Sequence, residues 1–289
     1  MLDKKVLAKI DPMTWNGHTH TEFCPHGSKE DTEIFVKKAI KLGFKTYSIT
    51  EHFPMPPEFA SKASGDLMAI NKAAFNYSVL PKYFSKVNYL KEKYKDQISI
   101  LVGFEFDFIY EFREWTAEQL FKYHKDIDDA ILSIHFLPTS KGLREVDYSY
   151  SDYVDGVLKE YKTFQGVMDA YLETLLKAIK WSPQYKPSRY GHISLYRRWV
   201  REFSKKDVII NPKTGKLISN IINLISQEGS MLDFNTSGLN KPSQLETSPN
   251  FSILQDAKNV GIPLIFGSDA HDTNNLSTGH DIYKNFITK

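Results

Sequence analysis

The sequence predicts an α/β fold in which parallel β-strands alternate with helices and form a TIM-like barrel. Short apolar, β-branched runs recur along the chain, and longer stretches with helical spacing lie between them. The 289 residues are 41% hydrophobic, which suffices for the core of one undivided barrel. Metal-binding residue types stand at the ends of the apolar runs, where a parallel barrel builds its active site. We therefore expect residues 1–289 to form one domain.

Seven segments are expected to be strands, because each is a short apolar run rich in β-branched or aromatic residues. In chain order they are 14–20 (TWNGHTH), 46–52 (TYSITEH), 98–107 (ISILVGFEFD), 129–137 (DAILSIHFL), 189–195 (RYGHISL), 230–238 (SMLDFNTSG) and 263–271 (PLIFGSDAH).

Six intervening segments are expected to be helices: 29–43, 79–95, 115–126, 151–181, 216–228 and 250–260. Gly43 and Gly261 mark two of the helix ends, since glycine readily adopts the left-handed conformation that closes a helix. Segments 54–66 and 138–152 are polar and rich in turn-forming residues, and we expect them to be loops that cover a site.

Composition excludes several classes of partner. Positive and negative charges nearly cancel, at a net charge of +2, and lysine and arginine are scattered, so we expect no nucleic-acid partner. A single cysteine rules out an intramolecular disulfide and suits a reducing compartment. The start of the chain has no apolar run of signal-peptide length, and no later stretch is long enough to span a membrane. We expect a cytoplasmic protein without a membrane partner.

Seven of the nine histidines, with one glutamate and one aspartate, lie at or near the ends of the expected strands or on the loop after the first of them. The set is His18, His20, His26, His52, Glu105, His135, His192, Asp269 and His271. The carboxyl ends of parallel strands meet on one face of a barrel. Residues two apart on a strand also point to the same side, as His18 and His20 do. One such histidine is commonly a core or surface residue, but seven together favour a metal site.

Imidazoles and carboxylates without a set of thiolates favour Zn, Mn or Fe. Nine ligands exceed the needs of one tetrahedral ion, so more than one metal is expected, as in hydrolytic phosphoryl chemistry. Cys24 is a poor candidate nucleophile, because a cysteine-dependent phosphatase needs an arginine six residues on, where Glu30 stands. We expect Cys24 to be a small buried side chain. The stretch TGKL at 214–217 lacks the upstream glycine and the Ser/Thr of a phosphate-binding loop.

The ordered motifs HTH with CPHG, ITEH, GFEFDFI, SIHFL, GHISLYRR and GSDAH resemble those of the polymerase and histidinol phosphatase (PHP) superfamily, and in particular its histidinol-phosphate phosphatase branch. The resemblance runs from about residue 16 to residue 271. It implies a distorted (β/α)7 barrel with three divalent metal ions, Zn, Mn or Fe. It also implies a ligand assignment: the first ion on His18, His20, Glu105 and Asp269, the second on Glu105, His135 and His192, and the third on His26, His52 and His271.

The function expected from this resemblance is hydrolysis of a small phosphate ester. L-histidinol phosphate, an intermediate of histidine biosynthesis, is the expected substrate. Two alternatives stay open: another phosphoesterase of the same superfamily, acting on a nucleotide, a nucleic acid or phosphotyrosine, and a module that binds metal without catalysis.

Asp269 receives a second role, and three further residues are given roles. Asp269 is expected to handle a proton as well as bind metal. Arg197, just past the fifth expected strand, is a candidate for a two-pronged contact to the phosphate, with a solvated charge as its alternative. Asp107 shares a strand face with Glu105, and Glu58 lies in the loop 54–66, so both are candidates to bind the substrate's cationic end.

Overall fold

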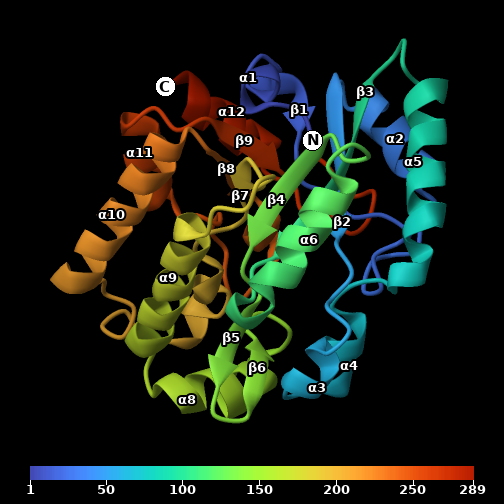
Figure 1. The fold of residues 1–289 in the computed structure, drawn as a ribbon. Coiled ribbons are helices and arrows are strands. Elements are labelled where there is room, and N and C mark those ends of the chain that lie inside the picture. The colour runs from blue at the N-terminus through green and yellow to red at the C-terminus, as the bar shows by residue number, and fades with distance from the viewer.

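The computed structural model describes residues 1–289 and contains a barrel of seven parallel strands (Figure 1). Its strand order is β1-β2-β3-β4-β7-β8-β9, and every neighbouring pair is parallel. The barrel closes between the first and last strands, because Gly17 N donates to Phe266 O and Asp269 N donates to His18 O, both at 2.8 Å. The strands are β1 Trp15–Asn16, β2 Thr46–His52, β3 Ser99–Asp107, β4 Asp129–Ser133, β7 Arg189–Tyr190, β8 Met231–Asn235 and β9 Leu264–Gly267. The predicted α/β barrel with seven strands is confirmed.

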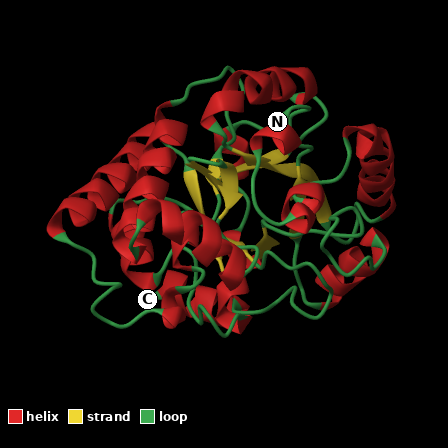
Figure 2. Ribbon diagram, turned by 90° about the horizontal axis from the view of Figure 1, so that it is seen from below, coloured by secondary structure: helices red, strands yellow, loops and turns green.

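Helices surround the strands on the outside of the barrel (Figure 2). The positions of Gly43 and Gly261 just past two helices are confirmed, with φ of 86° and 78°. Side chains of Asp31, Asn211 and Asn250 cap three helix starts by accepting backbone N–H groups. The helices are α1 Lys4–Leu7, α2 Thr32–Lys41, α3 Phe59–Lys62, α4 Leu67–Lys72, α5 Leu80–Lys93, α6 Arg113–Tyr123, α7 Tyr150–Tyr153, α8 Lys159–Tyr161, α9 Phe164–Lys180, α10 Pro212–Glu228, α11 Phe251–Asn259 and α12 His280–Thr288.

The expected single helix 151–181 is wrong. Helix α7 continues through a π-helical turn at Val154–Leu158 into α8. The helical conformation then ends at Lys162, where φ is 70°. Thr163 starts α9 anew by accepting a hydrogen bond from Gly166 N. Threonine favours this capping role over a position inside a helix, because its hydroxyl competes for backbone groups.

Three expected strands and both expected loops also differ from the prediction. Segment 14–20 is a strand only at Trp15–Asn16. Segment 129–137 leaves the barrel after Ser133, and β5 Phe136–Thr139 pairs antiparallel with β6 Gly142–Glu145. Segment 189–195 pairs only at Arg189–Tyr190. The hairpin contacts segment 54–66, since Ser64 N donates to Leu143 O at 2.8 Å. The β5–β6 hairpin and segment 54–66 form an ordered layer with α3 and α4 at the carboxyl end of the strands, the lower end in Figure 1.

A buried ion pair fills the barrel beneath the carboxyl ends of the strands. Arg189 on β7 has no exposed surface, and its Nη2 donates to Asp129 Oδ2 and to Gly17 O at 2.6 Å each. Asp129 Oδ2 also accepts from Ser48 Oγ at 2.7 Å, and Ser48 in turn accepts from the Trp15 indole. The pair therefore connects strands β1, β2, β4 and β7 directly below His18.

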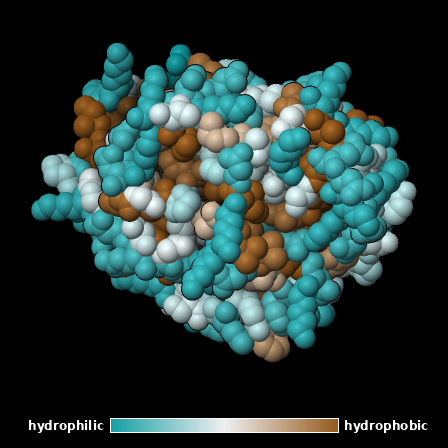
Figure 3. Space-filling model, turned by 90° about the horizontal axis from the view of Figure 1, so that it is seen from above, coloured by the Kyte–Doolittle hydropathy of each residue, from teal (hydrophilic) through white to brown (hydrophobic).

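The amino end of the barrel is closed by apolar side chains around α1. Leu7 packs there with side chains from four strands, Trp15, Leu101, Met231 and Ile265. Figure 3 looks onto this end and shows apolar side chains in a hollow between hydrophilic ones. Among the helices, none combines the length and the apolar character needed to cross a membrane.

The ion pair gives the first testable prediction. Asp129→Asn keeps the shape but leaves the Arg189 charge buried and uncompensated, so the unfolding free energy should fall by about 3–5 kcal/mol. The double variant Asp129→Asn/Arg189→Met removes both charges and should recover most of that loss. Urea unfolding of the parent and the two variants measures these free energies. An unfolding free energy of Asp129→Asn within about 1 kcal/mol of the parent value would contradict the role of the pair.

Candidate metal centre

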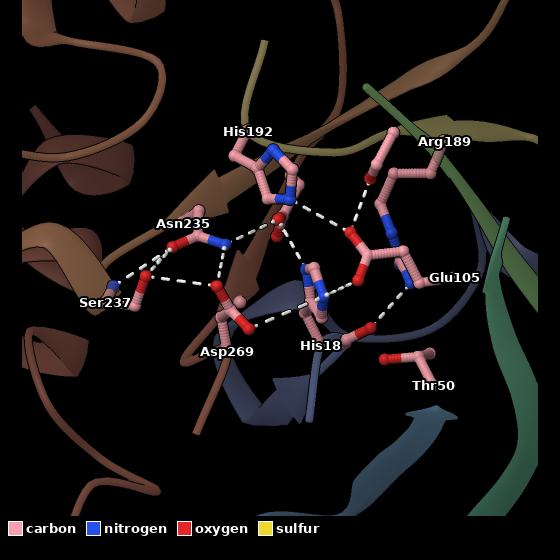
Figure 4. Close-up of polar contacts among 12 residues, drawn as sticks. His18, Thr50, Glu105, Arg189, His192, Asn235, Ser237 and Asp269 are labelled. Carbon is pink, nitrogen blue, oxygen red and sulfur yellow. Dashed lines mark hydrogen bonds and ion pairs between the residues drawn. The ribbon is translucent and has the colours of Figure 1, made fainter. Parts of the chain in front are cut away.

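The nine candidate ligands come together at the carboxyl end of the barrel. A cavity of about 460 Å³ opens there, and His26, His52, His135, His192, Asp269 and His271 line it. The register of β2 and β3 places His52 directly beside Glu105. His18, His20 and Glu105 are fully or almost fully buried and offer ligand atoms within 4.8 Å of one another, as do His52, Glu105 and His135. Figure 4 shows His18, His192 and Asp269 turned toward Glu105 from different strands or the turns that follow them.

Six of the imidazoles form three facing pairs. The two Nε2 atoms lie 3.2 Å apart in the pair His18/His20, 3.1 Å apart in His135/His192 and 3.0 Å apart in His26/His271. His18 and His20 lie together just past the end of β1. The other two pairs each join segments that are far apart in the sequence and meet only in the folded barrel.

Four of these imidazoles are held from behind by acceptors of their Nδ1 protons. The acceptors are Asp233 Oδ2 for His18 at 2.7 Å, Asp107 Oδ1 for His135 at 2.8 Å, Lys72 O for His26 at 2.9 Å and Asp269 O for His271 at 3.0 Å. A carbonyl or carboxylate only accepts, so the neutral ring carries its proton on Nδ1 and turns an Nε2 lone pair toward the partner ring. Such facing lone pairs are suited to a cation placed between them.

Glu105 lies between two of the pairs. Its Oε1 accepts from Ser133 Oγ and lies 2.9 Å from His192 Nε2. Its Oε2 lies 3.3 Å from His18 Nε2 and 3.5 Å from His20 Nε2, with no hydrogen-bond partner. Burial by itself would raise the pKa of this carboxyl, but the surrounding histidines His18, His135 and His52 hold it well below the ordinary value. Glu105 is thus an ionised carboxylate with one oxygen directed at each pair.

Asp269 completes the group in a strained backbone conformation, with φ of 48°. Its Oδ1 is 3.3 Å from His20 Nε2. Its Oδ2 accepts from Asn235 Nδ2 at 3.1 Å and from Ser237 Oγ at 3.0 Å (Figure 4). The two donors fix the carboxylate so that Oδ1 is the oxygen presented to the histidines.

Arg197 is misplaced for the phosphate contact that the sequence suggested. Both prongs of its guanidinium bind Glu246, with Nη2 3.1 Å from Oε2, and it does not line the cavity. Arg198 does line the cavity, stacks at 4.1 Å on the Trp199 ring and is held by Ser243 Oγ. The chain turns through a short 3-10 helix at Leu195–Arg197, which directs the second arginine inward instead of the first.

Glu58 lies away from the cavity, whereas Asp107 borders it and has a second contact that the sequence did not suggest. Glu58 is exposed at the start of α3 and is not among the cavity residues. Asp107 borders the cavity, but its Oδ1 accepts from both the backbone N and Nδ1 of His135, at 3.1 and 2.8 Å, so it orients that ring. Cys24 is fully buried as expected, and its sulfur lies near His20, His52 and His271.

Sequence reasoning missed several polar residues of the site. Asp233 and Asn235 alternate on β8 with the same spacing as His18 and His20, so their positions on one strand face could have been noticed. Glu145, Asp147 and Lys241 line the cavity too, but the hairpin that carries the first of them had no strand signal of its own.

Comparisons with known proteins agree with this geometry. The family model of the PHP domain matches residues 16–237. Histidinol-phosphatase of Bacillus subtilis is 33% identical over 93% of this chain and 97% of its own length. The crystal structure of a Listeria monocytogenes protein assigned as a histidinol phosphatase is 38% identical, with a TM-score of 0.91 over 93% of this chain and 99% of that one.

A third comparison extends the likeness of the fold. Histidinol phosphate phosphatase of Lactococcus lactis, solved with zinc, L-histidinol and phosphate, is 21% identical, with a TM-score of 0.68 over 95% of this chain and 94% of that one. The match of the family model to most of the barrel, together with these relatives, identifies the chain as a member of the PHP domain family.

Proposed function

We propose that this protein is a metal-dependent phosphate monoester hydrolase that converts L-histidinol phosphate to L-histidinol and inorganic phosphate, a step of histidine biosynthesis. The observation that carries the proposal is the set of three facing imidazole pairs around Glu105 in one cavity. The histidinol-phosphatase names of the relatives from Bacillus subtilis and Listeria monocytogenes support the choice of substrate. The ligands come from positions 18 to 271, so we treat residues 1–289 as one functional domain.

Each imidazole pair is proposed to hold one divalent ion, Zn, Mn or Fe. Two nitrogens bound at about 2.0–2.1 Å to one tetrahedral ion lie roughly 3.3 Å apart, and the pairs have separations of 3.0–3.2 Å. His18 and His20 would hold the first ion with Glu105 and Asp269, and His135 and His192 the second with the other oxygen of Glu105. His26 and His271 would hold the third with His52.

Divalent ions in such a site supply Lewis-acid stabilisation of the phosphoryl oxygens and activate water for attack on phosphorus. The protein's own residues then orient the substrate and move protons. Asp269 is directed by Asn235 and Ser237, and its carboxylate is proposed to handle a proton of the attacking water. Arg198 is proposed to bind phosphoryl oxygens through its planar fork, with Lys241 as a second cation at the same cavity.

Two acidic residues of the cavity suit the cationic end of the substrate. Glu145 and Asp147 line it, and each has a buried carboxylate oxygen without a hydrogen-bond partner. Burial, with the Asp147 charge beside it, raises the pKa of Glu145 well above the ordinary value. An ammonium group is the complement that such a pair lacks. A nucleic acid would instead call for a basic, open groove, so the lining favours a small amino-alcohol phosphate.

The metal assignment predicts the consequence of changing the bridging residue. Reconstituted protein should contain more than two metal equivalents per chain. Glu105→Gln should retain about one and lose activity, because the neutral amide cannot serve two ions. Mass-spectrometric metal analysis and turnover measure this, with exposed Glu58→Gln as the matched control that changes neither. Near-native turnover of Glu105→Gln would rule out the bridging role.

The two neighbouring arginines should respond differently to the same substitution. Arg198→Lys should lower kcat/KM about tenfold, or about 1.4 kcal/mol, because an ammonium lacks the two-pronged geometry. Arg197→Lys should leave kcat/KM nearly unchanged, since its partner Glu246 lies away from the cavity. Steady-state kinetics of both variants decide between them, and the opposite ranking would return the phosphate contact to Arg197.

Substrate choice is tested by comparing two esters. The protein should prefer L-histidinol phosphate to p-nitrophenyl phosphate in kcat/KM despite the better leaving group of the latter, because contacts to the remote amine are used in the transition state. Asp147→Asn should erode this preference while hydrolysis of p-nitrophenyl phosphate persists. Equal preference in the parent protein would reduce the assignment to a general phosphoesterase, and a panel with nucleotides and phosphotyrosine would then find the substrate.

A further inference from the structure

His20 is one of three rings in the centre, with His52 and His192, whose Nδ1 makes no hydrogen bond. The Nδ1 of His52 faces Glu105 Oε2 at 3.2 Å. Four other ring histidines direct this atom at a carboxylate or carbonyl oxygen 2.7–3.0 Å away. The His20 ring is completely buried, and its Nε2 faces Glu105 Oε2 and Asp269 Oδ1 at 3.5 and 3.3 Å. Its Nδ1, on the other side, makes no hydrogen bond. A buried polar atom without a hydrogen-bond partner is costly, so we expect a partner for Nδ1 close behind the ring.

The carboxylate that lies within 4 Å of that nitrogen is Glu51, which is also completely buried. Its Oε2 lies 3.8 Å from His20 Nδ1 and makes no hydrogen bond itself. Its Oε1 is held firmly, because the backbone N and the Oγ1 of Thr21 both donate to it at 2.6 Å. One oxygen is thus anchored and the other is free, directed toward a nitrogen that is free as well.

The position of Glu51 follows from the strand that carries it. On β2, successive side chains point to opposite sides, so His52 enters the cavity while Glu51 points behind it toward the segment that follows β1. Thr21 comes directly after His20 on that segment, and its two donors bring the carboxylate to the rear of the imidazole.

We propose that Glu51 is the positioning residue of His20: its free Oε2 accepts the Nδ1 proton and so keeps the Nε2 lone pair available to a metal ion. The inference rests on the proposed metal centre, since it concerns how one ligand is prepared for an ion. A neutral imidazole has a single N–H, and a carboxylate behind the ring fixes it on Nδ1. A movement of about 1 Å, small for side chains, brings the two atoms to hydrogen-bond distance.

Glu51→Gln tests the proposal with almost no change of shape. The amide oxygen has to stay with the Thr21 donors, so the NH2 group faces His20 Nδ1 and donates where the carboxylate accepted. Nδ1 then has to act as the acceptor and the proton moves to Nε2, which opposes metal binding there. Loss of such a supporting partner typically weakens metal affinity about 10–100-fold.

The measurement is a Zn²⁺ titration of metal-free protein against a chromogenic chelator, with urea unfolding of the same metal-free samples. One equivalent should bind about 10–100-fold more weakly in Glu51→Gln, with the remaining equivalents and the metal-free stability little changed. Glu22→Gln, a nearby half-buried glutamate outside the centre, is the charge-matched control and should bind as the parent does. Thr21→Val should also bind nearly as the parent does, because the Thr21 backbone N–H still anchors Oε1.

Unchanged affinity in Glu51→Gln, or an equal loss at every site together with lower metal-free stability, would overturn the positioning role. Failure of the proposed function gives a different result. A parent protein that binds one Zn²⁺ equivalent or fewer would remove the metal centre itself, whereas a parent that binds several equivalents with an indifferent Glu51 variant would remove only the inference about Glu51.

Discussion

The structure depends on the enclosure of one carboxylate by imidazoles. Glu105 is almost fully buried, and nitrogens of His18, His20, His52, His135 and His192 lie within 3.8 Å of its oxygens. Burying a charge in this way is expensive unless opposite charge accompanies it. The imidazoles cannot all be protonated at such close spacing, since like charges would repel. Divalent ions between the rings, as proposed above, would resolve both problems by supplying the opposite charge without protonating the imidazoles.

The barrel is built to tolerate this concentration of polar groups. Beneath the centre, the Arg189–Asp129 pair fills the interior with two opposite charges, and Arg189 also donates to the backbone at Gly17, just before His18. Around the centre, Asp233 and Asp107 hold two rings from behind, and Asn235 holds Asp269. Rigid supports of this kind keep ligands in a geometry suited to an ion before any ion binds.

The layer at the mouth of the barrel completes the wall of the cavity. The β5–β6 hairpin contacts the segment before α4, and Arg144 on β6 binds Asp152 at 2.8 Å, which ties the hairpin to α7. This layer contributes Glu145, Asp147 and Tyr148 to the cavity, while the barrel side contributes Arg198 and Asp269. The cavity therefore carries both acidic and basic lining residues, which is the lining that the proposed substrate, with a dianionic phosphate and a cationic amine, requires.

The sequence by itself predicted the α/β barrel and its seven strands, because strand and helix periodicity are local patterns. It also singled out nine candidate ligands that lie together in the structure, because the carboxyl ends of parallel strands meet on one face of a barrel. It did not determine the break at Lys162 or the hairpin after Ser133, where local capping and packing override periodicity. Nor could it choose between Arg197 and Arg198, since one residue of turn decides which guanidinium enters the cavity and which binds Glu246. The partners behind the ligands, Asp233 for His18 and Glu51 near His20, were likewise decided only by the tertiary structure, because side chains 215 and 31 positions apart meet through barrel closure rather than through any spacing along the chain.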